Sequence, residues 1–194
     1  MKIDNLIHTA EIETALGVFS PENWGFVKRP DVPMGNVGRV WVKDFPQVGK
    51  VCFAPLSWQH SDQKMLWERE YEPPKEMSFL DIVQHIQTVV WGMQVGDTIS
   101  SIEMAVIEGT GGYIGVAYPL DEGFTPESWL GFVLGYGNVD GVLASQMLGT
   151  NPKQYKAGIG QHLKMVQAYE ALLTGHHAVE WTFDPTRSQD AHLN

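Results

Sequence analysis

The residues 142–165, VLASQMLGTNPKQYKAGIGQHLKM, have the types and spacing suited to binding an anion. An apolar run ends at Gly149, a short loop bearing lysines follows, and Gly158 and Gly160 open an amphipathic segment. A strand, a glycine loop and a helix in this order direct unpaired backbone N–H groups and the positive end of the helix dipole at one point. We therefore expect a phosphate group to bind at this junction.

The local charge supports a bound phosphate. This segment carries Lys153, Lys156 and Lys164 and no acidic residue, although the whole chain has a formal net charge of -10. The overall acidic balance argues against nucleic acid or an anionic membrane as a partner, because both require a broad basic surface. His162, on the predicted helix, is expected to be solvated rather than to contact the phosphate.

Other kinds of catalytic chemistry find little support in the residue pattern. The seven histidines form no pair at metal-binding spacing, so we expect no metal site. Cys52 lies in an apolar run and is expected to be buried rather than nucleophilic. Ser145 lacks the glycines that flank a hydrolase nucleophile. No apolar run approaches the ~20 residues of a membrane helix and no signal peptide is evident, so we expect a cytoplasmic protein.

The elements that must position the glycine loop follow from hydrophobic spacing. In the N-terminal third we expect a helix over residues 3–16, irregular chain over 19–36, a β-hairpin, a loop or a single helical turn over 57–65, and a strand over 67–71. The hairpin strands are predicted at 37–43 and 48–54. From residue 77 onward we expect helices at 77–91, 100–108, 158–173 and from 184, and strands at 113–118, 128–136, 142–149 and 178–183.

This order of elements predicts an α/β (α+β) fold with a mixed, mostly antiparallel central sheet flanked by helices. Short connections join the three strands between residues 113 and 149, so these strands should be antiparallel. The helix at 158–173 crosses to the strand at 178–183, which makes that strand parallel to the strand at 142–149. We expect an N-terminal extension with a β-hairpin over residues 1–72 and the main domain over 73–194.

These residues resemble the GNAT superfamily of acyl-CoA N-acyltransferases. The resemblance rests on the order of elements, the glycine loop, and the segments Gln146–Gly149 and Glu180–Pro185, the latter reading EWTFDP. It is closest to a group of bacterial predicted acetyltransferases and covers about residues 70–194. Gly158 and Gly160 match the glycines of the family loop, whereas Tyr155 occupies its Arg or Gln position.

The resemblance implies that acetyl-CoA is the co-substrate. Its pyrophosphate would lie on the N–H groups of residues 156–161, its pantetheine arm would pair with residues 147–149, and the N–H of Leu148 would stabilise the oxyanion. The residues implied in cofactor binding are Met147, Leu148, Gly149, Tyr155, Lys156, Ala157, Gly158, Ile159, Gly160 and Gln161.

The implied reaction is direct attack by a small-molecule amine on the thioester. A free alkyl ammonium has a pKa of ~10, so a base or a desolvating pocket must remove its proton. Glu180, Asp184 and Glu103 are the candidate bases. Asp184 better fits the N-cap of a last helix because Pro185 follows it. We therefore expect Glu180 and the Leu148 N–H to act in catalysis.

Relatives usually continue with two further strands and often a tyrosine that protonates the thiolate, whereas this sequence ends at Asn194. The sheet could be completed by strands from residues 37–71 or by a partner chain, or the fold could be truncated. An open sheet edge would favour a homo-oligomer such as a dimer. The alternative function is a catalytically inactive, truncated GNAT-like module with a binding or assembly role.

Overall fold

The computed structural model describes residues 13–32, 39–57 and 78–182. The expected loop at 57–65 is described only at residue 57, and the strand at 67–71 lies outside these ranges, as do Asp184 and the helix expected from it. Residues 13–18 are helical, which is the described end of the helix expected over 3–16.

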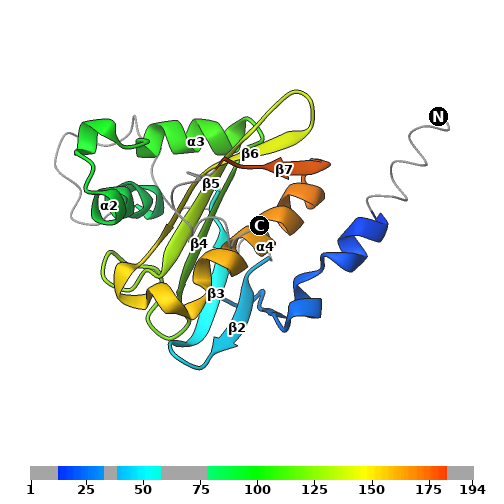
Figure 1. Ribbon diagram of the computed structural model, residues 1–194, viewed down its shortest axis with the longest axis horizontal. Helices are drawn as coiled ribbons and strands as arrows, with labels where there is room; N and C mark the ends of the chain where they lie inside the picture. Colours follow the sequence, from blue (N-terminus) through cyan, green and yellow to red (C-terminus); the bar gives the residue numbers. More distant parts are fainter. Residues whose placement is uncertain (1–12, 33–38, 58–77, 183–194) are drawn as a thin grey trace.

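A single seven-stranded sheet forms the centre of the molecule, with its strands side by side in chain order (Figure 1). The strands are β1 (Val27–Lys28), β2 (Trp41–Phe45), β3 (Gly49–Pro55), β4 (Tyr113–Pro119), β5 (Gly131–Gly137), β6 (Val142–Thr150) and β7 (Ala178–Glu180). All neighbouring strands are antiparallel except β6 and β7, which are parallel. The predicted mixed, mostly antiparallel sheet is confirmed.

Helices cover both faces of the sheet. The helices α2 (Phe79–Trp91) and α3 (Ser101–Gly109) lie on one face, and α4 (Ile159–Leu173) crosses the other (Figure 1). Short 3-10 helices lie at Pro21–Trp24 (η1), Val95–Asp97 (η4) and Pro152–Ala157 (η5). Each face has its own hydrophobic core, because successive side chains of a strand point to opposite sides. We call these the α2/α3 face and the α4 face.

The N-terminal strands are part of the same sheet. The expected hairpin is confirmed as β2 and β3, and β3 pairs with β4 from Val51 opposite Pro119 to Pro55 opposite Gly115. The expectation of irregular chain over 19–36 is wrong at Val27 and Lys28, which form β1. A strand of two residues is too short to show an alternating hydrophobic pattern in the sequence. The extended conformation of Val27 and Lys28 is instead determined by their pairing with β2. Since the hairpin joins the sheet beside β4, it does not supply a strand beside β7.

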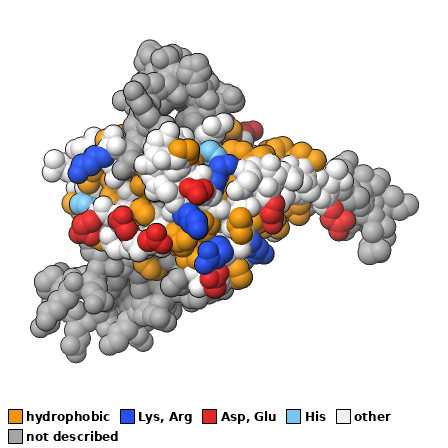
Figure 2. All heavy atoms as spheres, turned by 90° about the horizontal axis from the view of Figure 1, so that it is seen from below, with side chains coloured by type: hydrophobic (Ala, Val, Ile, Leu, Met, Phe, Trp, Pro, Cys, Tyr) orange, Lys and Arg blue, Asp and Glu red, His pale blue; other side chains and the backbone are white. Residues whose placement is uncertain are grey.

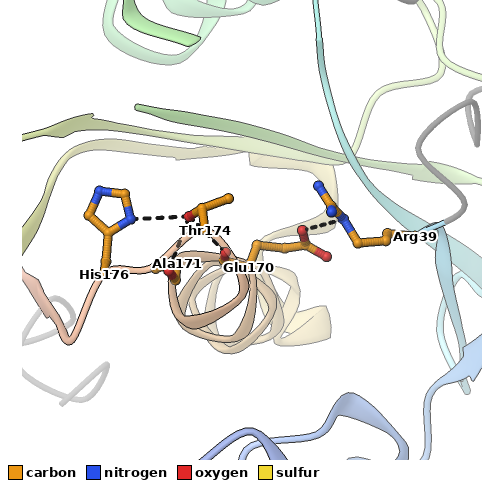
Figure 3. Close-up of polar contacts among 5 residues, drawn as sticks. All are labelled: Arg39, Glu170, Ala171, Thr174 and His176. Atoms are coloured by element: carbon orange, nitrogen blue, oxygen red, sulfur yellow. Dashed lines mark hydrogen bonds and ion pairs between the residues drawn. The ribbon is translucent and has the colours of Figure 1, made fainter. Parts of the chain in front are cut away.

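A buried ion pair connects α4 to the start of β2. Glu170 on α4 is 1% exposed, and its Oε2 lies 2.8 Å from Nε of Arg39 (Figure 3). Burial raises the pKa of Glu170 to about 7, against the opposing effect of the Arg39 guanidinium. At the end of the same helix, the Thr174 hydroxyl lies 3.1 Å from Nδ1 of His176 (Figure 3).

Candidate active site

The parallel strands β6 and β7 separate part of the way along β6. They pair over three residues of each strand, from Val142 opposite Ala178 to Ala144 opposite Glu180. Beyond Ala144, β6 continues to Thr150 with β5 on one side, while the described part of the chain places no strand on its other side. The backbone of β6 therefore offers unpaired hydrogen-bonding groups to whatever enters this gap.

The hydrogen-bond alternation between β5 and β6 directs the Leu148 N–H into the gap. The N–H of Asn151 donates to Leu130 O at 2.9 Å, so the next pair along the ladder, Gly131 with Thr150, has no mutual hydrogen bonds. Hydrogen-bonded and non-hydrogen-bonded pairs alternate along an antiparallel ladder, so the pair of Val133 with Leu148 also has no mutual hydrogen bonds. The N–H and C=O of Leu148 therefore point away from β5.

A β-bulge in β6 coincides with the separation. The register shifts after Leu134, which pairs with Met147, to Gly135, which pairs with Ser145, so that Gln146 has no opposite residue. The bulge places Ser145 on the α4 face, where it contacts that helix, and Met147 on the α2/α3 face. It thus changes which side chains border the gap.

A cavity of about 470 Å³ lies where the two strands part. It is lined by Ala144, Ser145, Gln146, Val179, Glu180, Trp181 and Thr182. The sequence-predicted residue Glu180 is therefore at the cavity. Leu148 lies three residues further along β6 than Ser145, on the way from the cavity to the glycine loop.

The glycine loop consists of η5 followed directly by α4. Gly158 is the N-cap of α4 and has φ 74°, in the left-handed region that favours glycine. Tyr155, Lys156 and Ala157 belong to η5, so the expected run of free N–H groups over 156–161 is interrupted by a 3-10 turn. The helix itself begins at Ile159, and its first N–H groups have no partner within the helix.

Gly160 lies next to the end of β6. A Cβ at Gly160 would lie 3.4 Å from side-chain atoms of Leu148 and Thr150, which is an ordinary van der Waals contact. A Cβ at Gly149 would lie 2.8 Å from the Phe132 ring. The end of β6 and the start of α4 are therefore packed closely together at the predicted cofactor-binding segments.

The candidate base Glu180 shares a face of the sheet with a phenol. Tyr136, Ala144 and Glu180 lie opposite one another across β5, β6 and β7, so their side chains point to the same face. This is the α2/α3 face, because Tyr136 packs against its core. The Tyr136 hydroxyl donates to Oε1 of Glu103 on α3 at 3.3 Å. Two of the three predicted acidic candidates, Glu103 and Glu180, are thus on one face.

The position of Lys164 differs from the one inferred from the sequence. Its Nζ donates to Ser145 Oγ and lies 4.8 Å from the centroid of the Trp181 ring, so it contacts two residues of the cavity wall and is not part of the glycine loop. The Ser145 hydroxyl in turn donates to Gln167 Oε1 at 2.7 Å. Sequence reasoning missed this cluster; the spacing of Lys164 and Gln167, three residues apart on a helix, was its one available signal.

His162 is half-buried, and its ring packs against three phenylalanine rings instead of being fully solvated. Its ring centroid lies 5.6 Å from Phe26, 5.0 Å from Phe45 and 6.3 Å from Phe53. Burial lowers its pKa, although Nδ1 lies 2.8 Å from Gly158 O. This imidazole therefore ties the start of α4 to the β2–β3 hairpin.

Other kinds of site find no support among the described residues. No group of three His, Cys, Asp or Glu side chains in these ranges could hold a metal ion. No described helix is long and apolar enough to cross a membrane. On one face of the molecule, acidic and basic side chains are interspersed with exposed hydrophobic ones (Figure 2). This face is not the broad basic surface that nucleic acid requires.

Comparison with solved structures identifies the fold. An aminoglycoside acetyltransferase from an uncultured soil metagenomic sample, in complex with sisomicin, matches with a TM-score of 0.51 and 13% identity over 73% of this chain and 83% of that chain. The same enzyme in complex with trehalose matches equally well. An aminoglycoside N-acetyltransferase in complex with CoA has a TM-score of 0.47 at 13% identity, over 73% of this chain and 84% of the other.

No protein-family model and no curated protein sequence matches the chain. The expected GNAT-like fold is nevertheless confirmed by the structural match. The matched share of the chain is larger than residues 70–194, so it extends into the N-terminal third. The strands β2 and β3 offer a structural reason, since they continue the central sheet.

Proposed function

We propose that this protein transfers an acyl group from an acyl-CoA to a small-molecule amine by direct attack. The observation that carries the proposal is the separation of β6 from β7, which leaves the Leu148 N–H directed into a gap that opens onto a cavity. An extended pantetheine arm can pair with such a strand edge as a further strand would. Acetyl-CoA is the first donor to test.

The proposed binding mode uses the backbone of two elements. The CoA pyrophosphate would lie at the start of α4, where Gly158, Ile159, Gly160 and Gln161 offer N–H groups and the helix dipole favours an anion. The pantetheine arm would run along Met147 to Gly149 toward the cavity. The thioester oxygen would then accept a hydrogen bond from the Leu148 N–H, which becomes stronger as negative charge develops on that oxygen.

The acceptor amine would approach from the α2/α3 face. Glu180 lines the cavity from that face, and a carboxylate there can accept the proton that an alkyl ammonium must lose. Glu103 and Tyr136, hydrogen-bonded to each other on the same face, add negative charge and a hydroxyl group. The soil metagenomic enzyme of similar fold, which is an aminoglycoside acetyltransferase, supports an amine acceptor.

A pair of substitutions at Leu148 tests the proposed role of its N–H. Leu148→Pro removes the N–H, and no bond to β5 is lost because that N–H points away from β5. We expect kcat for amine acetylation to fall roughly 100- to 1000-fold, the typical loss for one oxyanion donor. The control Leu148→Ala removes the side chain and keeps the N–H, so its kcat should stay near that of the parent.

Calorimetry with acetyl-CoA separates the two candidate functions. Heat of binding together with amine-dependent release of CoA thiol supports the acyltransferase. Heat of binding without thiol release from any amine in a broad panel supports a non-catalytic binding module. The variant Gly158→Glu serves as the non-binding control in this calorimetry. If the parent protein, like this control, gives no heat with acetyl-CoA, that result would falsify both candidate functions.

A further inference from the structure

The ammonium group of Lys164 lies directly behind two residues that line the cavity, and it has no carboxylate partner among the described residues. It contacts the Ser145 hydroxyl and the face of the Trp181 ring, and both of these residues line the cavity. Burial lowers the pKa of Lys164 to about 8. A desolvated cation costs folding free energy unless an anion compensates it.

In the described ranges, the groups in contact with Lys164 are neutral. From β6 it meets Ser145, after β7 it meets Trp181, and on α4 itself Gln167 accepts from the Ser145 hydroxyl. The nearby carboxylates are directed elsewhere: Glu180 points to the opposite face of the sheet, and Glu170 pairs with Arg39. Among the described residues, the cation therefore has no anionic partner that a ligand would have to displace.

The position of Lys164 matches the acyl end of the proposed donor and not its phosphates. Ser145 lies on the cavity side of Leu148, whereas the glycine loop lies on the other side. Ser145 and Leu148 are three residues apart, or roughly 10 Å of strand. An acyl chain that starts at the Leu148 N–H and extends into the cavity would bring its far end to Lys164.

We propose that Lys164 binds the terminal carboxylate of a short dicarboxylic acyl group, so that the preferred donor is the CoA monothioester of such a diacid rather than acetyl-CoA. An acyl group of about four or five carbons fits the span between the Leu148 N–H and Lys164. This inference rests on the proposed acyltransferase function and specifies its donor.

The reaction itself is unchanged by the extra carboxylate. The amine nitrogen attacks the thioester carbon, a C–N bond forms, the C–S bond breaks, and the electron pair leaves with sulfur. One proton is lost from the amine nitrogen and one is gained by the CoA sulfur. The distal carboxylate stays ionised and takes part in binding only.

The face of the sheet assigns the carboxylate to the acyl group rather than to the acceptor. Lys164 lies behind Ser145 on the α4 face, and Glu180 lines the cavity from the α2/α3 face, where we place the amine. An acceptor carboxylate would have to cross the gap between β6 and β7 to meet Lys164. An acyl chain lying within that gap meets Lys164 directly.

The test compares succinyl-CoA with butyryl-CoA, which have acyl chains of equal length and differ in the terminal charge. With a primary amine that lacks a carboxylate, we expect kcat/KM for succinyl-CoA to exceed that for butyryl-CoA roughly 10- to 100-fold, the usual range for a hydrogen bond to a charged group. Lys164→Met should abolish this preference by lowering the succinyl-CoA value alone. Lys164→Arg should retain the preference, and Lys50→Met, at an exposed position on β3, should leave both values unchanged.

Calorimetry with both thioesters in the absence of amine gives a second readout, in which the parent should bind succinyl-CoA more tightly than butyryl-CoA. Equal or weaker binding and turnover of succinyl-CoA overturns the inference and leaves the acyltransferase proposal standing. If Lys164→Met instead lowers kcat/KM only for amines that carry a carboxylate, Lys164 serves the acceptor and the inference is wrong. If the parent binds no acyl-CoA at all, both proposals fall.

Discussion

At the scale of single residues, Glu170 is a carboxylate whose burial has a measurable consequence. It is 1% exposed, and burial raises its pKa from 4.5 to about 7 despite the Arg39 guanidinium 2.8 Å away. The folded protein therefore binds a proton at Glu170 more tightly than the unfolded chain does. Above about pH 7 the carboxyl is ionised in both states, and folding carries the cost of burying the charge.

The sign of the pH effect follows from this shift. Because the folded pKa is the higher one, the contribution of Glu170 to stability falls as pH rises from about 4.5 to about 7, and below pH 4.5 no penalty exists. In Glu170→Gln this slope is absent. We expect the free energy of unfolding of the variant, relative to the parent, to rise by roughly 2–3 kcal/mol across that window.

Urea unfolding at pH 4.5, 6 and 8 measures this difference. At any one pH, the difference in free energy of unfolding between Glu170→Gln and the parent includes the loss of the ion pair with Arg39. The informative quantity is therefore how this difference changes with pH. The exposed position Glu127 supplies the control Glu127→Gln. A constant difference between Glu170→Gln and the parent at all three pH values would contradict the assignment.

At the scale of elements, α2 begins with a capping box formed by Ser78 and Asp81. The Ser78 hydroxyl accepts from Asp81 N at 3.0 Å, and Oδ2 of Asp81 accepts from Ser78 N at 3.0 Å, which forms a capping box. The helix ends at Gly92, with φ 67°. Its buried face packs on the sheet through Ile82, Val83 and Ile86.

We expect Ser78→Ala to lower the free energy of unfolding by about 1 kcal/mol, because the substitution leaves the Asp81 N–H without its acceptor. Thermal and urea unfolding measure this loss. Ser101→Ala, one position inside α3 and not a cap, is the matched control and should change stability much less. An equal effect of the two substitutions would show that the box contributes nothing beyond the loss of a hydroxyl.

At the scale of the whole molecule, the sheet joins the N-terminal third to the rest. The pairing of β3 with β4 continues the sheet from β1 to β7, and both hydrophobic cores contain residues from β2 and β3. Trp41 on β2 is 2% exposed and contacts Tyr169 of α4. Neither part has a complete core without the other.

We therefore expect the chain to unfold in one cooperative transition. Tryptophan fluorescence, which includes Trp41, and far-ultraviolet circular dichroism, which reports the helices, should give the same midpoint in urea. Deletion of residues 1–57 is expected to prevent folding of the remainder, because it exposes β4 and removes buried residues from both cores. Two separate transitions would indicate that the extension folds on its own.

The sequence by itself determined the class of the fold and the α-helices and strands between residues 78 and 180, but not the 3-10 helices η4 and η5. Helical spacing and the strand runs are local signals, because each depends on residues a few positions apart. The same locality explains why the sequence located the glycine loop and placed Leu148 and Glu180 on strands that a crossover helix makes neighbours.

The tertiary structure alone decided which groups meet at the gap between β6 and β7. The bulge at Gln146, the direction of the Leu148 N–H and the contact of Lys164 with Ser145 depend on register and packing between segments distant in the chain. A one-residue difference in register would reverse the face of every side chain on β6. Register is a property of paired strands, so a single sequence pattern could not reveal that Lys164 contacts Ser145 in the cavity wall.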